Sequence, residues 1–135
     1  MKPQDILLLL KLCVSSRDKW KSTDLARELG LSQPEVSLAT RRCVNAGLLS
    51  EDKQKVARKS LFEVLVYGVK YFFPAKIGPM TRGMPTAHSA PPLLAQLTDG
   101  GEPYVWTEFP GTMRGQSLKP LYPSVITAAQ KDQEL

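Results

Sequence analysis

Apolar positions recur at helical spacing through the first half of the chain, and glycines divide that pattern into short segments. The repeat of three to four residues predicts helices at residues 3–15, 22–29 and 33–46. Gly30 and Gly47 follow the second and third of these helices, where glycine enters the left-handed conformation without a steric penalty. The sequence therefore predicts short helices joined by tight glycine turns.

The third helix carries strong start signals. Ser32 and Glu35 have the spacing of a capping box, and Pro34 falls in the first turn, where a missing N–H has no consequence. Ser22 or Thr23 is expected to cap the second helix in a similar way. The residues expected on the buried face of the third helix are Val36, Thr40, Cys43 and Val44.

The apolar pattern is less regular between residue 58 and Pro74. Residues 58–67 fit a helix that stops at Gly68, although they also include β-branched residues typical of strands. Residues 69–73 alternate only at their start, and we expect a strand there that ends at Pro74.

The stretch LARELGLSQPEVSLATRRCVNAGLLS resembles the helix-turn-helix of the MarR-type winged-helix regulators. It has their Leu-Ala in the supporting helix, the Gly-Leu-Ser turn and the Ala-Gly-Leu-Leu exit into the wing. The resemblance implies a mainly α fold with a small β wing, in which the second helix of the motif lies in the DNA major groove. A helical hairpin that packs against another protein is the alternative.

Helical spacing also identifies the residues of the third helix that would face DNA. If the expected buried face points inward, the outward residues are Gln33, Ser37, Leu38 and Arg41. Gln33 suits adenine, Arg41 suits guanine, and Leu38 suits a thymine methyl group. Arg42 is turned to the side, and we expect it to hold a phosphate. Arg41 has the alternative role of gripping only the backbone.

The polar segment SEDKQKVARKS after Leu49 lies where a winged-helix protein has its wing, which must here be short. The residues that would reach phosphates from it are Lys53, Lys55, Arg58 and Lys59. An ordinary solvated loop is the alternative for any single one of these residues. The charge distribution supports phosphate contacts from this segment. Residues 1–60 hold 12 Lys and Arg against 7 Asp and Glu, while residues 61–135 hold 6 of each.

Composition changes at Pro74, and nine of the 11 prolines lie from there onward. We therefore expect a winged helix-turn-helix domain at residues 1–73 and an irregular, proline- and glycine-rich arm at residues 74–135 for dimerisation or a partner protein. Ser124 is a candidate cap for a final helix. The stretch KYFFPAKIGPMTRGMPTAHSAPPL also resembles bacterial winged-helix proteins with a proline-rich C-terminal extension, a match that implies no activity.

The arm contains two similar segments, each with an Arg-Gly pair after a small turn. Arg82 and Arg114 have the forked guanidinium that suits phosphate or carboxylate, so they are candidates for ligand or partner binding. The alternative is that both arginines pair with nearby acids or with a helix end.

Catalytic and cofactor signatures are missing from the sequence. His88 is the only histidine and lies in a Ser/Pro-rich loop, and Cys13 and Cys43 fall on expected core faces without metal-ligand spacing. We expect neither an enzyme nor a metal or cofactor. The apolar run at residues 6–14 is too short to cross a bilayer and has no cleavage site, so the expected compartment is the cytoplasm, with no membrane partner.

The function expected from these features is sequence-specific binding of double-stranded DNA by a bacterial transcriptional regulator. A homodimer on a palindromic operator is expected, formed through the arm and the first helix, where Leu7, Leu8 and Leu10 exceed one core stripe. The alternative is an antitoxin-like or adaptor protein, whose winged helix and arm bind a partner protein.

Overall fold

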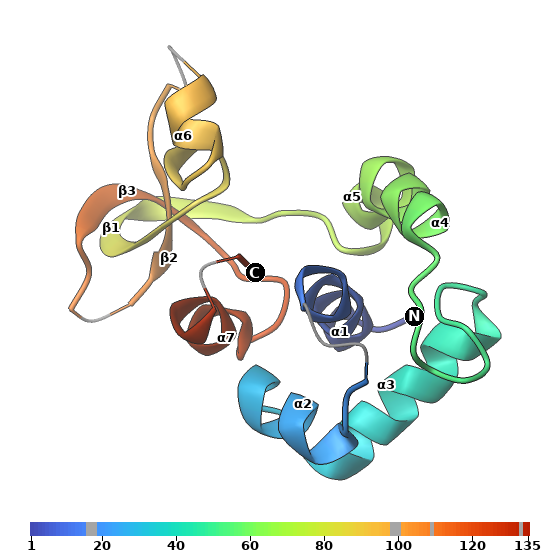
Figure 1. Cartoon of the computed structure of the whole chain (residues 1–135). Helices are drawn as coiled ribbons and strands as arrows, with labels where there is room; N and C mark the ends of the chain where they lie inside the picture. Colours follow the sequence, from blue (N-terminus) through green and yellow to red (C-terminus); the bar gives the residue numbers. More distant parts are fainter. Residues whose placement is uncertain (16–18, 98–100, 109, 133) are drawn as a thin grey trace. The chain divides into compact units, whose positions relative to one another are not determined.

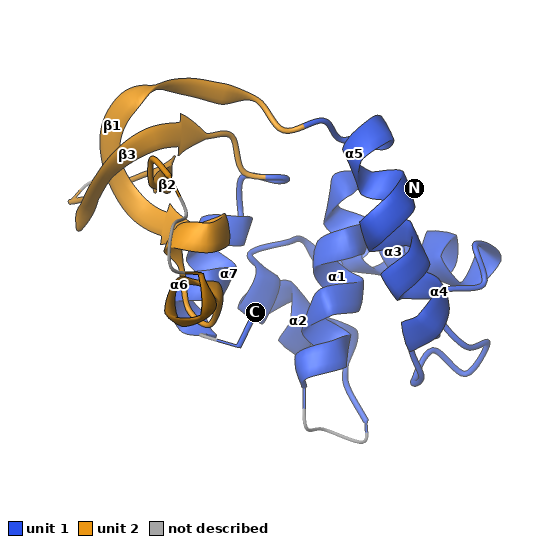
Figure 2. Ribbon diagram, turned by 90° about the horizontal axis from the view of Figure 1, so that it is seen from above, with its two compact units in different colours: residues 1–74, 121–135 blue, residues 75–120 orange. Residues whose placement is uncertain are grey.

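The computed structural model describes residues 1–15, 19–97, 101–108, 110–132 and 134–135. Across these ranges the chain is rich in helix and carries a small three-stranded sheet (Figure 1). It divides into two compact units (Figure 2), and unit 1 comprises Met1–Pro74 together with Leu121–Leu135. Unit 2 comprises Ala75–Pro120. The sheet lies in unit 2, although the sequence predicts its small β element in the wing.

Unit 1 is helical. Its elements are α1 (Pro3–Val14), α2 (Ser22–Leu29), α3 (Gln33–Asn45), α4 (Arg58–Glu63), the π-helical turn η1 (Val64–Gly68), α5 (Val69–Phe72) and α7 (Val125–Lys131). The three helices predicted in the first half of the chain are confirmed. The hydrophobic core joins the inner faces of α1, α2 and α3 to Leu48, Leu49 and Leu61, each 3% exposed.

Helix α1 supplies more of this core than one stripe requires. Leu7, Leu8 and Leu9 are all buried within the chain's own core, and Leu10 is only partly buried. From sequence, Leu7 and Leu8 are expected to be an apolar excess that a second subunit covers. That premise is wrong, because α1 packs on both α2 and α3 and needs a broad apolar surface for the two contacts.

The turn between α2 and α3 has the local chemistry that the sequence predicts. Gly30 ends α2 in the left-handed region with φ of +63°, and its backbone N–H donates to the Ala26 carbonyl. Ser32 Oγ accepts from the Glu35 backbone N–H at 3.3 Å, and the Ser32 backbone N–H donates to Glu35 Oε2 at 2.9 Å. This capping box satisfies otherwise unpaired N–H groups and fixes the start of α3.

The predicted cap of α2 is wrong, because the N-cap residue is Lys21, and Ser22 and Thr23 lie inside the helix. The predicted strand at residues 69–73 is also wrong. Helix continues from α4 through η1 into α5 and ends at Phe72, so Gly68 is a helical residue. Aromatic and β-branched residues favour strands only where a neighbouring strand is available to pair with them.

Between α3 and α4 the chain makes a minimal hairpin, residues 49–56. Leu49 and Val56 form an isolated antiparallel bridge, and the Ser50 backbone N–H donates to the Lys55 carbonyl at 2.9 Å. The Ala57 backbone N–H closes the base of the hairpin on the Leu48 carbonyl at 3.0 Å. The segment expected to form a short two-stranded wing therefore contains a single bridge in place of two full strands.

Unit 2 has regular structure that the sequence analysis did not predict. Strand β1 (Ile77–Thr86) pairs antiparallel with β2 (Tyr104–Thr107) and with β3 (Met113–Leu118), and β2 pairs in parallel with β3. The three strands close into a small barrel. Short helices η2 (Ala87–Ser89) and α6 (Leu93–Gln96) connect β1 to β2. Much of the region expected to be irregular thus forms a sheet.

The last segment of the chain belongs to unit 1, whereas the sequence analysis assigned all of residues 74–135 to one arm. Ala128 of α7 is 1% exposed, and Tyr122 and Val125 pack against the same core as α1. The predicted helix is present and Ser124 is its N-cap residue, as expected, but the side chain makes no capping hydrogen bond: Ser124 Oγ is buried and has no partner among the described residues.

Candidate nucleic-acid interface

The outer face of α3 is exposed along most of its length. Gln33, Ser37, Leu38 and Arg41 are all exposed, as helical spacing predicts, and Leu38 keeps 45% of its surface in solvent. The inner face is fully buried at Val36, Ala39 and Cys43. The core therefore fixes the orientation of α3 and leaves a row of polar side chains, with one leucine among them, facing outward.

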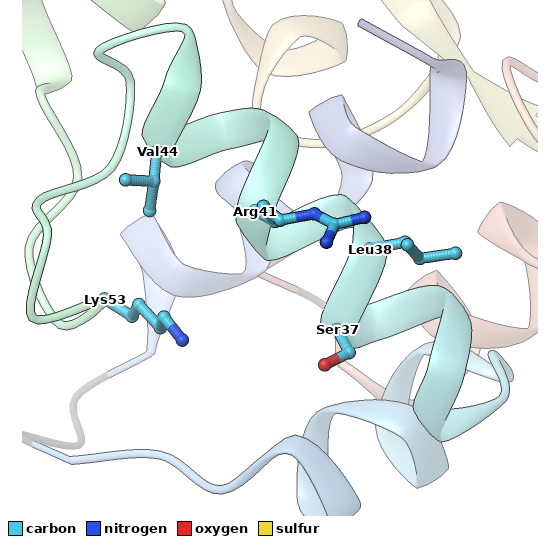
Figure 3. Close-up of a pocket in the computed structure, with 5 residues that line it drawn as sticks. All are labelled: Ser37, Leu38, Arg41, Val44 and Lys53. Carbon is cyan, nitrogen blue, oxygen red and sulfur yellow. The ribbon is translucent and has the colours of Figure 1, made fainter.

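A groove of about 210 Å³ lies between α3 and the 49–56 hairpin (Figure 3). It is lined by Ser37, Leu38, Arg41, Val44 and Lys53. In Figure 3, the side chains of Ser37 and Lys53 point into the space between helix and hairpin, and the Arg41 side chain extends along α3 toward Leu38. The structure thus brings two cations from separate elements to one groove.

The hairpin tip is held by its own side chains, a network that the sequence analysis missed. Ser50 Oγ donates to Asp52 and accepts from the Lys55 backbone N–H, and Asp52 Oδ1 accepts from the Gln54 backbone N–H at 3.1 Å. The hydrogen bond from Ser50 lowers the pKa of Asp52 below its usual range. The Ser-x-Asp spacing, typical of a turn, was the available signal.

Lys53 has an unusual backbone conformation, with φ of 62°. For a residue with a Cβ, this left-handed conformation costs about 1–2 kcal/mol. Asp52 and Ser50 stabilise the turn that imposes it. Glycine would be more stable at this position because it adopts a positive φ without strain. Stability alone therefore does not explain why a lysine is present here.

The other cations predicted in this region divide into two groups. Lys55 and Lys59 are exposed. Arg58 is exposed too, but its Nη2 donates to the Cys13 carbonyl at 2.7 Å, in the last turn of α1. That carbonyl is one of the orphan acceptors at a helix C-terminus, so Arg58 stabilises the end of α1.

The structure gives Arg42 a role different from the predicted phosphate contact. Its Nε and Nη2 donate to the two carboxylate oxygens of Asp5, at 2.9 and 2.6 Å. Asp5 is fully buried, and it also accepts from the Lys2 backbone N–H at 2.7 Å. This pair raises the pKa of Arg42 and attaches α3 to the first turn of α1. Arg42 is therefore a structural residue.

Asn45 and Cys43 lie on opposite faces of α3, one exposed and one buried. Asn45 is exposed and lies four residues after Arg41, so it continues the outward row at the same spacing by which Arg41 itself follows Ser37. Asn45 was not among the residues predicted to face DNA, although the helical spacing indicates it. Cys43, on the opposite face, is buried beside Asp5, and burial raises the pKa of its thiol to about 12, which makes it inert at neutral pH.

The start of α3 is also tied to the C-terminal segment. Tyr122 Oη donates to Glu35 Oε1 at 3.1 Å, while Glu35 Oε2 accepts from Ser32. These hydrogen bonds, those from Ser32 foremost, lower the pKa of Glu35. Its negative charge is thus used to hold the helix start and stays at the N-terminal end of α3, away from Arg41 near the other end.

In unit 2, Arg82 and Arg114 face each other on β1 and β3 as directly paired residues, and both are exposed. Both lie in strands. The turn predicted before Arg82 is wrong, because residues 78–81 lie within β1, whereas bends at Pro110 and Thr112 do precede Arg114. A Cβ at Gly83 would lie 2.0 Å from the Trp106 carbonyl oxygen, and one at Gly115 would lie 2.5 Å from that of Pro103. Close strand packing therefore requires each glycine. This explains the glycine of each Arg-Gly pair but not the arginine.

Metal and membrane features were also sought among the described residues. They contain no cluster of three or more His, Cys, Asp and Glu side chains that would hold a metal ion. His88 Nε2 lies 3.1 Å from the Glu102 carbonyl oxygen, and its ring packs edge-on against Tyr104 with 4.9 Å between centroids. No helix of the described chain has the length and apolar character needed to span a bilayer.

Comparison with known proteins adds no family to this description. No family model matches the chain, and searches of curated proteins and of solved structures likewise return no match.

Proposed function

We propose that this protein binds double-stranded DNA in a sequence-specific way and acts as a transcriptional regulator. The observation that carries the proposal is the groove between α3 and the hairpin, which Arg41 and Lys53 line together with the exposed residues Ser37 and Leu38. A helix whose inner face is locked into a core and whose outer face is polar is suited to insertion in the major groove.

In this proposal the fold is a winged helix-turn-helix of the MarR type. Helix α2, the Gly30 turn and α3 form the helix-turn-helix, and the 49–56 hairpin is a reduced wing. Gln33 pairs with adenine, Arg41 with guanine, and Leu38 contacts a thymine methyl group. Asn45 joins the set as a further residue able to reach the DNA from the end of α3.

Phosphate contacts come from the wing and the start of α4. Lys53, Lys55 and Lys59 are exposed there, and their charge supplies affinity that does not depend on sequence. Arg42 is left out of this set because its guanidinium is bound to Asp5. Arg58, the first residue of α4, donates to the Cys13 carbonyl at the end of α1 and contributes its positive charge from there.

A regulator of this kind gains affinity by binding a palindromic operator as a homodimer, with half-sites about one helical turn apart. The proposed setting is the cytoplasm of a bacterium. Selection of bound duplexes from a random pool tests the function. Enrichment of a palindrome, with affinity that falls steeply with salt, supports it; equal binding of all duplexes or no binding of any overturns the sequence-specific proposal.

The second candidate function is an antitoxin-like or adaptor role in which this same groove binds a partner protein. The observation in its favour is Leu38, a large apolar side chain that is 45% exposed and lines the groove. Leu38→Ala separates the two. It weakens DNA binding only at sites containing the contacted thymine if the first proposal holds, whereas stable co-purification of one protein, lost in Leu38→Ala and without any DNA shift, favours the second.

A further inference from the structure

The helical segment α4–η1–α5 exposes an apolar surface that the DNA-binding proposal does not use. Four aromatic residues, 62–75% exposed, lie on it together with Val66, which is 42% exposed. These aromatic residues are Phe62, Tyr67, Tyr71 and Phe72. Figure 1 shows α4 and α5 as one helical segment that follows the hairpin. So many exposed rings on a short helix indicate a surface that another molecule covers.

The π-helical turn keeps these side chains exposed on the same side of the helix. Nine residues of regular α-helix rotate a side chain by about 900°, which would place Tyr71 opposite Phe62. In η1 the Val69 backbone N–H donates to the Val64 carbonyl, five residues earlier, so the turn is wider and rotates less per residue. Exposed residues consequently recur at four-residue spacing, at 62–63, 66–67 and 70–72.

This row is complementary to a reversed copy of itself. When two such segments lie antiparallel across a two-fold axis between Val66 and Tyr67, Phe62 lies opposite Tyr71 of the second copy, and Val66 lies opposite its Tyr67. Glu63 then lies opposite Lys70 of the second copy, and the two-fold axis repeats each of these contacts. The apolar positions meet apolar positions, and the only two charges in the row meet with opposite sign.

The surface is also large enough for a stable contact. From the usual areas of such side chains, the four exposed residues that face the second copy (Phe62, Val66, Tyr67 and Tyr71) present on the order of 500 Å² per copy, so two copies bury about 1,000 Å², the lowest area expected of a specific interface. A groove of about 550 Å³ lies beside the row, with Glu63 and Tyr67 in its wall and Ala46, Leu48 and Val64 among its apolar lining. It offers a ring of the second copy a place to insert.

We propose that the α4–η1–α5 segment is the interface of a symmetric homodimer, with a second copy of this chain packed antiparallel on it. This replaces α1 as the expected dimer surface, since Leu7 and Leu8 are buried within one chain. The inference extends the proposed function, which uses two copies on a palindromic site. Its test needs no DNA, so either proposal can fail without the other.

Sedimentation velocity of the full chain over a range of micromolar concentrations tests the interface. The wild-type protein forms a concentration-dependent dimer, and Val66→Asp, next to the two-fold axis, becomes monomeric while its circular dichroism spectrum is unchanged. The matched control is Leu94→Asp, which adds the same charge at a 51% exposed apolar site in α6 and leaves the dimer intact. A monomeric wild-type protein, or a Val66→Asp variant that remains dimeric, overturns the proposal.

Charge reversal tests the antiparallel register. Glu63→Lys alone and Lys70→Glu alone each place like charges across the axis twice, and we expect each to weaken the dimer roughly tenfold. An equimolar mixture of the two variants forms a heterodimer in which both pairs are again attractive, and its affinity returns to the wild-type level. If the mixture associates no better than either variant alone, these residues do not face each other and the register is wrong.

Discussion

The guanidinium of Arg42 and the carboxylate of Asp5, 37 residues apart in sequence, form a two-point ion pair between α3 and α1. Asp5 is fully buried, and the Arg42 side chain keeps only 26% of its surface in solvent. The pair fixes the rotation of α3 about its own axis, because Arg42 cannot reach Asp5 unless Cys43 also faces the core. Arg41, the preceding residue, is thereby held outward on the side of the groove.

Replacement of Arg42 by alanine is expected to lower the free energy of unfolding by about 3–5 kcal/mol, since it leaves a buried carboxylate without its counter-charge. Arg42→Ala/Asp5→Leu recovers part of this loss, because the buried charge is removed with its partner. Denaturant unfolding measures both. A loss below about 1 kcal/mol for Arg42→Ala would show that the pair is not a structural bond and would return Arg42 to the phosphate contacts.

The wing lysine at the hairpin tip permits a test in which instability cannot imitate lost binding. Lys53→Gly removes the charge and relieves the positive φ, so it stabilises the protein while it weakens binding to all duplexes alike. The slope of log affinity against log salt is expected to fall by about one unit. Lys76→Gly, an exposed lysine of unit 2, is the control for loss of charge alone. An unchanged slope in Lys53→Gly excludes the hairpin tip from the DNA.

Lys11 provides a pH-dependent tie between α1, α2 and the C-terminal segment. Burial acts to lower the pKa of Lys11, but hydrogen bonds from its ammonium group to Asp132 and Glu28 outweigh burial and raise the pKa above its ordinary value of 10.5. The Lys11 hydrogen bond lowers the pKa of Asp132 below its ordinary value of 3.8. The Asp132 contribution to stability is therefore present above pH 3.8 and lost as pH falls through the lowered value. The Lys11 contribution is present below pH 10.5 and lost as pH rises through the raised one.

Lys11→Met is accordingly expected to reduce stability by about 2 kcal/mol at neutral pH, with a difference from wild type that shrinks at both extremes. Thermal unfolding across the pH range measures it, and Lys119→Met, an exposed lysine of unit 2, is the control. A difference that is the same at every pH would mean that Lys11 acts through its aliphatic chain and not through its charge.

The parts of the fold that were predictable from sequence are those set by local chemistry. Gly30, Ser32 and Glu35 carry caps that act within a few residues, so the turn and the start of α3 could be located correctly. The outward row of α3 follows from the helical repeat alone. The same repeat also places Asn45 in this row, although Asn45 was not among the predicted residues.

What was missed depends on contacts between distant segments. Spacing along one helix indicates the direction of Arg42 but not the presence of Asp5 on another helix. The strand expected at residues 69–73 is wrong because its aromatic residues continue a helix whose inner side packs on the core at Leu61, and the described residues of unit 1 contain no strand that could pair with it. The role of residues 121–135 was hidden for a similar reason, since α7 packs on a helix almost a hundred residues earlier.

The most direct test of DNA reading by α3 is the affinity of Arg41→Ala for the selected duplex and for random DNA. If Arg41 contacts a guanine, its loss costs roughly 1–3 kcal/mol on the selected site and little on random DNA, so the specificity ratio falls. Arg27→Ala, which removes the same charge from an exposed arginine of α2, leaves that ratio unchanged. Equal losses on both DNAs would contradict base readout by Arg41 and assign it to the phosphate backbone.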